Sequence, residues 1–101
     1  MGTKGRPRPA NLSRKLRQIR VALGLSQLQI IRRFGFEDSL HPGRISEYES
    51  SMREPSLLIL LAYARLAGVH LEDIVDDRID LPARLPGRVS YRSDRDQRGY
   101  G

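Results

Sequence analysis

The sequence predicts an all-α protein built from five short helices. Between about residues 11 and 81, apolar residues recur three or four positions apart, which is the spacing of one face of an α-helix. Glycine, or a Pro-Ser pair, interrupts this pattern every few turns. The alternation that marks a β-strand never continues for more than four residues. The chain has 101 residues, so a single domain is expected.

The first two helices are predicted over residues 12–23 and 27–34. The first carries an apolar stripe spaced by 4, 3 and 4 positions, which consists of Leu12, Leu16, Ile19 and Leu23. Gly24 follows at a position where glycine adopts the left-handed conformation at little cost. Ser26 can cap the second helix and Gly35 ends it. The inward residues of this helix are Ile30, Ile31 and Phe34.

The third helix is predicted over residues 42–50. Pro42 suits the first helical position, because its missing N–H has no partner there in any case. Either His41 caps this helix, or Ser39 caps an additional turn. The inward residues are Ile45 and Tyr48.

The last two helices are predicted from Ser56 to Gly68 and over residues 71–75. Ser56 is the expected cap of the fourth helix. Its expected inward residues are Leu57, Leu60, Leu61, Ala64 and either Leu66 or Ala67. In the fifth helix, Glu72 and Asp73 are favourable near the positive end of the helix dipole. Its inward residues are Leu71, Ile74 and Val75.

Both ends of the chain differ in composition from the helical segment. Residues 1–10 combine Gly, Pro and three basic residues, and predict a flexible basic arm. Residues 82–101 contain five Arg with Pro and Gly, and too little apolar surface to offset the entropy of ordering. The predicted organisation is therefore an arm over 1–10, a helical domain over 11–81 and a disordered arginine-rich tail over 82–101.

Charge is distributed unevenly along the chain. The net charge is +6, and residues 1–36 contain nine Lys or Arg and no acid. Residues 71–80 contain five acids against one Arg. A basic region of this kind attracts polyanions such as nucleic acid. Charge alone also fits a basic face that only keeps the protein in solution.

Several classes of function have no support in the sequence. The chain has no Cys, and His41 and His70 lie far apart with no cluster of carboxylates around them. We therefore expect no enzyme activity, no metal site and no cofactor. No apolar stretch approaches the roughly 18 residues of a membrane helix, and the N-terminus lacks the apolar segment of a secretion signal. A cytoplasmic protein without a membrane span is expected.

The second and third helices form a pair that can project its second member into a DNA major groove. Such pairs also occur simply as core helices of small bundles. A more specific signal is the order of four motifs along the chain: Arg20 before LGLSQ, then ISEYE at 45–49, REPS at 53–56 and LAGVHLEDI at 66–74. Over Leu12 to Val75, this combination resembles the Cro/phage-repressor-like helix-turn-helix family, also called the XRE family. The resemblance implies a five-helix lambda-repressor-like bundle and a sequence-specific, repressor-like regulator that binds double-stranded DNA.

The resemblance also implies roles for individual residues outside the third helix. Gln27 matches a glutamine that hydrogen-bonds a DNA phosphate, with Ser26 as the helix cap. Arg20 and Glu49 match an ion pair that joins the first helix to the end of the third. Arg53 matches a basic position along the DNA backbone or minor groove.

The third helix is expected to contact bases through its first turn and the positions around Ile45. Of these residues, Pro42 and Gly43 carry no side-chain donor. Arg44 can bind a guanine edge, and Glu47 can accept from cytosine N4. Ser46 can face a phosphate or a thymine methyl group. In the alternative arrangement, Arg44 touches only phosphate and Glu47 pairs with Arg44 across one turn.

The chain departs from the family pattern between the second and third helices. Gly35 and Ile45 are ten positions apart, about four more than the resemblance leads one to expect for a helix-turn-helix connection. The inserted acids Glu37 and Asp38 would oppose a nearby phosphate backbone. Ile31 replaces a usual Ala where the two helices are closest, and we expect the longer connection to compensate for it. A further departure is Ser51, where a helix-ending Gly is usual.

Apolar residues in the fourth helix predict a contact with another protein chain. Leu58 and Ile59 stand where the family is often polar, and exposed aliphatic residues favour self-association, here as a homodimer. The alternative function is an interaction module of the antitoxin type, which binds a partner protein through this helix or the C-terminal tail. RNA binding has little support, because Tyr91 and Tyr100 lie only in the tail.

Overall fold

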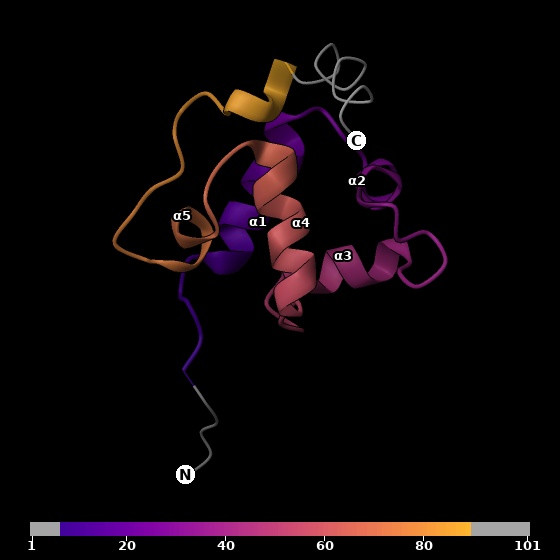
Figure 1. The fold of residues 1–101 in the computed structure, drawn as a ribbon. Helices are drawn as coiled ribbons and strands as arrows, with labels where there is room; N and C mark the ends of the chain where they lie inside the picture. The colour runs from indigo at the N-terminus through magenta and orange to yellow at the C-terminus, as the bar shows by residue number, and fades with distance from the viewer. Residues whose placement is uncertain (1–6, 90–101) are drawn as a thin grey trace, which may run out of the picture.

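Five α-helices and one short 3-10 helix make up residues 7–89, the part of the chain that the computed structural model describes (Figure 1). The helices are α1 (Leu12–Ala22), α2 (Gln27–Phe34), α3 (Pro42–Glu49), α4 (Leu57–Ala67), α5 (Leu71–Val75) and η1 (Pro86–Val89). No strand occurs within this range. The predicted all-α class with five α-helices is confirmed. Each predicted helix is present, with ends that differ by at most one residue from those expected.

Local capping groups explain where these helices begin and end. The hydroxyl of Ser26 accepts from the backbone N–H of Gln29, and the side chain of Gln29 accepts from the N–H of Ser26, which completes a capping box on α2. Ser56 accepts from the N–H of Ile59 at the start of α4. Gly35 and Gly68 end α2 and α4 in the left-handed conformation, which costs glycine little.

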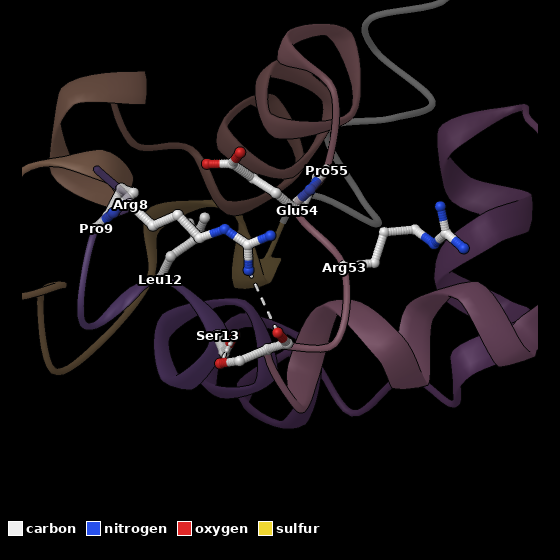
Figure 2. Close-up of a pocket in the computed structure, with 8 residues that line it drawn as sticks. Arg8, Pro9, Leu12, Ser13, Arg53, Glu54 and Pro55 are labelled. Atoms are coloured by element: carbon white, nitrogen blue, oxygen red, sulfur yellow. Dashed lines mark hydrogen bonds between the residues drawn. The ribbon is translucent and has the colours of Figure 1, made fainter. Parts of the chain in front are cut away.

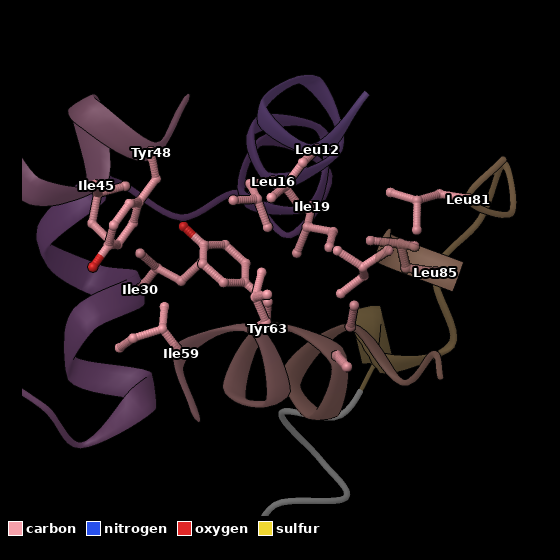
Figure 3. Packing of buried hydrophobic residues seen from close by; sticks show 14 of the residues in the cluster. Leu12, Leu16, Ile19, Ile30, Ile45, Tyr48, Ile59, Tyr63, Leu81 and Leu85 are labelled. Carbon is pink, nitrogen blue, oxygen red and sulfur yellow. The ribbon is translucent and has the colours of Figure 1, made fainter. Parts of the chain in front are cut away.

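The core lies between the five α-helices, each of which contributes apolar side chains to it (Figure 3). The side chains of α1 that enter it are Leu12, Leu16 and Ile19, as the sequence predicts. Phe34 at the end of α2 packs edge-on against the ring of Tyr63 in α4, with 4.9 Å between the ring centroids. This contact helps to hold α2 in place. A helix of only two turns is not stable by itself and depends on packing against the rest of the domain.

The inward face of α4 differs from the prediction. Leu57 is 72% exposed, whereas Ile59, expected at the surface, is only 8% exposed. The buried positions are Ile59, Leu60, Tyr63, Ala64 and Ala67. These residues lie on one face of the helix, the face whose Tyr63 packs against Phe34. The two leucines of the first turn, Leu57 and Leu58, therefore lie outside this face, on the exposed side.

A fully buried lysine joins α1 to α5. The side chain of Lys15 has no exposed surface, and its Nζ donates to the backbone oxygens of Asp73 (2.8 Å), Asp76 (3.0 Å) and Ile79 (2.6 Å). An ammonium group has three N–H donors, so these three acceptors satisfy it completely. The contact also places a positive charge at the negative end of the α5 dipole.

The ordered part of the chain continues past the expected boundary at Leu81. Leu85 is buried in the core, and η1 packs on α4. Gly87 lies so close to the end of α4 that an added Cβ would clash with the carbonyl oxygen of Leu66. The segment 82–89 is therefore part of the domain, and not of a tail. The predicted disorder of residues 90–101 falls outside the described residues.

At the other end, the last residue of the predicted arm, Ala10, is attached to the domain together with Asn11. The backbone N–H groups of Ala10 and Asn11 donate to the carboxylate of Asp77, at 2.7 and 3.0 Å. Residues 1–6 of that arm lie outside the described residues. Among the helices of residues 7–89, none has the length and apolarity needed to cross a bilayer.

Candidate nucleic-acid interface

α3 is buried along one side and exposed along the other. Ile45 and Tyr48 pack into the core, where α3 contacts α1 and α2. His41, Pro42 and Gly43, at the leading end of the helix, are all exposed. The preceding connection therefore does not cover this end. Figure 1 shows α3 at the edge of the molecule, with α2 above its leading end.

The long connection between α2 and α3 forms a turn fixed at both ends. The carbonyl oxygen of Phe36 accepts from the N–H groups of Ser39 (3.0 Å) and Leu40 (2.9 Å). The side chains of Phe36 and Leu40 pack against the core, while Glu37 and Asp38 are exposed. No additional helical turn begins at Ser39, and His41 is the residue before α3.

Ile31 is fully buried behind this connection. Its side chain belongs to the hydrophobic core and does not point to solvent. The proposed compensation between Ile31 and the inserted residues remains a prediction.

The leading end of α2 presents free backbone donors. Ser26 uses its hydroxyl on the N–H of Gln29, so the N–H groups of Gln27 and Leu28 keep no partner among the described residues. The side chain of Gln27 is half-buried. Free N–H groups and the positive end of the helix dipole together favour an anion such as a phosphate.

An ion pair connects α1 to the end of α3. Arg20 Nε donates to Glu49 Oε2 at 2.6 Å, and Arg20 Nη2 donates to Glu49 Oε1 at 3.0 Å. Arg20 Nη1 also donates to the carbonyl oxygen of Leu25, at 3.0 Å, just before α2. The side chains are 15% and 7% exposed, and the hydrogen bonds to Glu49 raise the pKa of Arg20. This pair therefore fixes the relative positions of α1, α2 and α3.

The hydroxyl of Tyr63 lies near this ion pair and is buried without a hydrogen-bond partner in the described structure. Burial, together with the negative charge of Glu49, raises the pKa of Tyr63 above its usual value. The phenol therefore stays neutral at physiological pH.

Arg44, Glu47 and Arg53 form a second group of charges, on the exposed side of α3. Glu47 Oε1 accepts from Arg53 Nε at 2.9 Å and lies 3.2 Å from Arg44 Nε. The hydrogen bond from Arg53 lowers the pKa of Glu47. Both predicted DNA-contacting arginines thus share one carboxylate. Ser46, one position before it, is exposed and free of these contacts.

Ser51, just past α3, adopts the left-handed conformation with φ of 67°. Its hydroxyl and that of Ser13 in α1 are hydrogen-bonded at 2.7 Å, and its carbonyl oxygen accepts from Arg8 Nη1 at 3.3 Å. These contacts hold a conformation that non-glycine residues rarely adopt. The sequence indicated the missing glycine but not these two partners.

A small pocket adjoins Ser51, between the N-terminal segment and the α3–α4 connection (Figure 2). It encloses about 50 Å³ and is lined by residues that include Arg8, Ser13 and Glu54. Figure 2 shows the Arg53 side chain directed away from the pocket. A volume this small cannot enclose an organic ligand, for which sites of about 300 Å³ or more are typical. No group of three metal-ligating side chains was found among residues 7–89.

The charged residues of α1 and α2 differ from the acidic residues after α5 in how far they are paired. Four exposed arginines of α1 and α2 form no ion pair with another described residue: Arg14, Arg17, Arg32 and Arg33. Two acidic residues after α5 are engaged instead, Asp76 with Arg78 and Asp77 with the N–H groups of Ala10 and Asn11. Lys15 is buried and does not add to the basic surface.

The chain matches a known family over most of this domain. A comparison with family profiles matches residues 16–74 to the helix-turn-helix family, of the XRE type with Cro/C1-like members. A search of curated proteins and a search of solved structures found no significant match. The matched segment runs from α1 into α5, includes both α2 and α3, and covers more than half of the chain. The protein therefore belongs to the XRE-type helix-turn-helix family of DNA-binding regulators.

Proposed function

We propose that this protein is a sequence-specific transcriptional regulator that inserts α3 into the major groove of double-stranded DNA. The observation that carries the proposal is the two-sided character of α3. Ile45 and Tyr48 fix the helix on the core, while its leading end and Ser46 remain exposed. A helix fixed in this way can enter the groove without unfolding or rearranging the domain.

The contacts we propose divide into backbone and base contacts. Gln27 and the free N–H groups at the start of α2, which Ser26 caps, bind one phosphate. Arg53 binds the backbone beyond the other end of α3. Arg44 contacts a base edge, and Ser46 a phosphate or a thymine methyl group. Gly43, which has no side chain, allows the start of the helix to approach the DNA closely.

We further propose that the regulator acts as a homodimer and represses by blocking access to its site. Leu57 and Leu58 are 72% and 70% exposed on the first turn of α4 and supply the apolar surface for the second copy. Ile59, which the sequence assigned to this surface, belongs to the core. A dimer would bind a palindromic site whose halves lie about 34 Å apart along the duplex. Such a regulator acts in the cytoplasm of a bacterial cell.

Selection of bound duplexes from random DNA at physiological salt tests the proposal. The wild-type protein should enrich one motif, palindromic if the protein is a dimer. Arg44→Ala should lose one position of that motif, at a cost of about 1–3 kcal/mol for the best site. Arg65→Ala, an exposed arginine on α4, is the matched control and should keep the motif. Wild-type protein that binds DNA without any sequence preference would refute the proposal.

A second function is favoured by the same exposed leucines. Leu57, Leu58 and Met52, which is 76% exposed in the connection before α4, would equally suit contact with a different protein, as in an antitoxin. The salt dependence of binding to random duplex separates the two functions. For a DNA regulator, log K should fall by roughly 0.9 for each phosphate neutralised when the salt concentration rises tenfold. For a pure protein-interaction module, binding to random duplex should depend hardly at all on the salt concentration.

A further inference from the structure

Glu47 lies between two arginines that α3 and its C-terminal connection bring together. The Nε atoms of Arg53 and Arg44 approach the same oxygen of Glu47, Oε1, at 2.9 and 3.2 Å. Arg44 Nε is itself buried from solvent and has no hydrogen-bond partner in the described structure. The carboxylate therefore accepts a hydrogen bond from Arg53 Nε and attracts the Arg44 guanidinium as an ion pair, on the inner edge of each group.

The outer donors of the two guanidinium groups are left available. A guanidinium group carries five N–H donors, and recognition of a guanine edge or a phosphate uses two of them side by side. No hydrogen bond joins an Nη atom of Arg44 or Arg53 to another residue in the described range. The side chains are 34% and 51% exposed, so their outer edges can reach a ligand while Glu47 keeps the inner edges.

The same geometry disfavours direct base contact by Glu47. Its Oε1 is already engaged twice, and a carboxylate that turned toward DNA would leave both arginines and approach the phosphates. Its lowered pKa, caused first by the hydrogen bond from Arg53, shows that the contacts favour the ionised carboxylate.

We propose that Glu47 is a positioning residue of the DNA-binding surface, which orients Arg44 toward a base edge and Arg53 toward the backbone without touching a base itself. This inference rests on the proposed function. The carboxylate also cancels one of the two positive charges, so it reduces sequence-independent attraction to DNA. Glu47 thus favours discrimination between sequences over affinity for any duplex.

Glu47→Gln tests this role, because it removes the charge and keeps an acceptor of the same size. The probes are the duplex selected by the wild-type protein and a scrambled duplex of equal length, each titrated over a range of salt concentrations. We expect the scrambled duplex to bind about three to ten times more tightly, with a steeper salt dependence. The ratio of the two affinities should fall about tenfold, or ~1.4 kcal/mol. Asp80→Asn, which removes one exposed acid after α5, is the matched control and should keep the ratio.

The double variant Arg44→Ala/Arg53→Ala distinguishes positioning from direct recognition. In that background, Glu47→Gln should leave the base preference unchanged, because the residues through which Glu47 acts are gone. If Glu47→Gln instead exchanged the preferred base at one position of the motif, or altered the preference in the double variant, Glu47 would be a base-contacting residue and the inference would be overturned.

A measurement without DNA separates this inference from the proposed function. In NMR spectra of the free protein, the Nε–H groups of Arg44 and Arg53 should exchange with water more slowly than that of exposed Arg14, and Glu47→Gln should remove much of the difference. Equal exchange in the wild-type protein would refute the positioning role, whatever the protein binds. A wild-type protein that shows slow exchange but selects no motif would refute the proposed function alone.

Discussion

Among the single residues, Lys15 is the one whose burial is hardest to predict from the local sequence. Lysine is almost never fully buried unless its charge is compensated. Here the compensation comes from three backbone oxygens, those of Asp73, Asp76 and Ile79. Backbone acceptors have no signature in the sequence, so the basic residues of α1 could not be divided into one buried and several exposed ones. A lysine inside the domain fixes the segment after α5 against α1.

Lys15→Met should destabilise the domain substantially. Methionine can replace the aliphatic stem but leaves buried carbonyl oxygens without a donor, at about 1–3 kcal/mol for an unsatisfied group. We expect the free energy of unfolding in urea to fall by about 2–4 kcal/mol, since more than one acceptor is affected. Arg17→Met, at an exposed position of the same helix, should change it by less than about 0.5 kcal/mol. Equal stability of the two variants would contradict the role assigned to Lys15.

Two opposing effects meet at Ser51. Glycine would relieve the cost of the left-handed conformation, about 1 kcal/mol. It would also remove the hydrogen bond to Ser13, which contributes about 0.5–1.5 kcal/mol. Ser51→Gly should therefore be nearly neutral in the wild-type protein, yet stabilise Ser13→Ala by about 1 kcal/mol. Urea unfolding of the four proteins in this cycle measures the difference, and equal effects of Ser51→Gly in both backgrounds would show that the hydrogen bond contributes nothing.

At the scale of elements, local signals predicted where helices begin and end. The caps Ser26, Gly35, Ser56 and Gly68 act within one helical turn, so their effect is visible in short stretches of sequence. Even the capping box of α2 is present in the sequence as Ser26 followed three positions later by Gln29. Helix boundaries therefore followed closely from the sequence.

The orientation of α4 could not be predicted, because it depends on a contact with another helix and not on local signals. Residues 57–62 are all apolar, so the pattern shows no contrast between an inward and an outward face. The orientation depends on Tyr63, whose ring meets Phe34 from another helix. Likewise, Leu85 enters the core only because Gly87 permits η1 to approach α4, which a composition rich in Pro and Arg conceals.

The candidate site was predictable in part. The exposed side of α3 follows from the burial of Ile45 and Tyr48, and the pairing of Arg44 with Glu47 follows from their spacing of three positions. The contact between Glu47 and Arg53 depends on how the chain leaves α3. Its geometry comes from Ser51 and its hydrogen bond to α1, which spacing alone does not contain.

The connection between α2 and α3 carries two acids close to the proposed DNA surface. Glu37 and Asp38 are exposed and have no contact with the core, so neutralising them should leave stability unchanged. If α3 enters the groove, Glu37→Gln/Asp38→Asn should strengthen binding to any duplex about two- to tenfold at low salt, with a smaller gain at high salt. Fluorescence anisotropy at several salt concentrations measures this, with Asp80→Asn as the control. Unchanged affinity at low salt would place the connection away from the DNA.

At the scale of the whole molecule, two acidic residues after α5 help to hold the fold. Asp77 fixes the chain just before α1 through two backbone N–H groups, and Asp76 pairs with Arg78 in the segment that also accepts from Lys15. Asp76 and Asp77 are thus engaged in contacts within the fold, while exposed arginines of α1 and α2 remain available to a polyanion. This arrangement links the stability of the fold to the ionisation of two carboxylates.

Stability should consequently decrease in acid. The hydrogen bonds from Arg78 lower the pKa of Asp76 to about 2, and those from Asn11 and Ala10 lower the pKa of Asp77. In the unfolded chain an aspartate has a pKa of about 3.9, so the folded state binds protons less readily than the unfolded state. The stabilisation is complete above about pH 4 and is lost as the pH falls toward 2. Urea unfolding between pH 6 and 2 should show this decline, and Asp77→Asn should make it shallower because the amide does not titrate. Asp80→Asn should leave the slope closer to that of the wild-type protein, and an identical slope in all three proteins would exclude Asp77 as a source of the pH dependence.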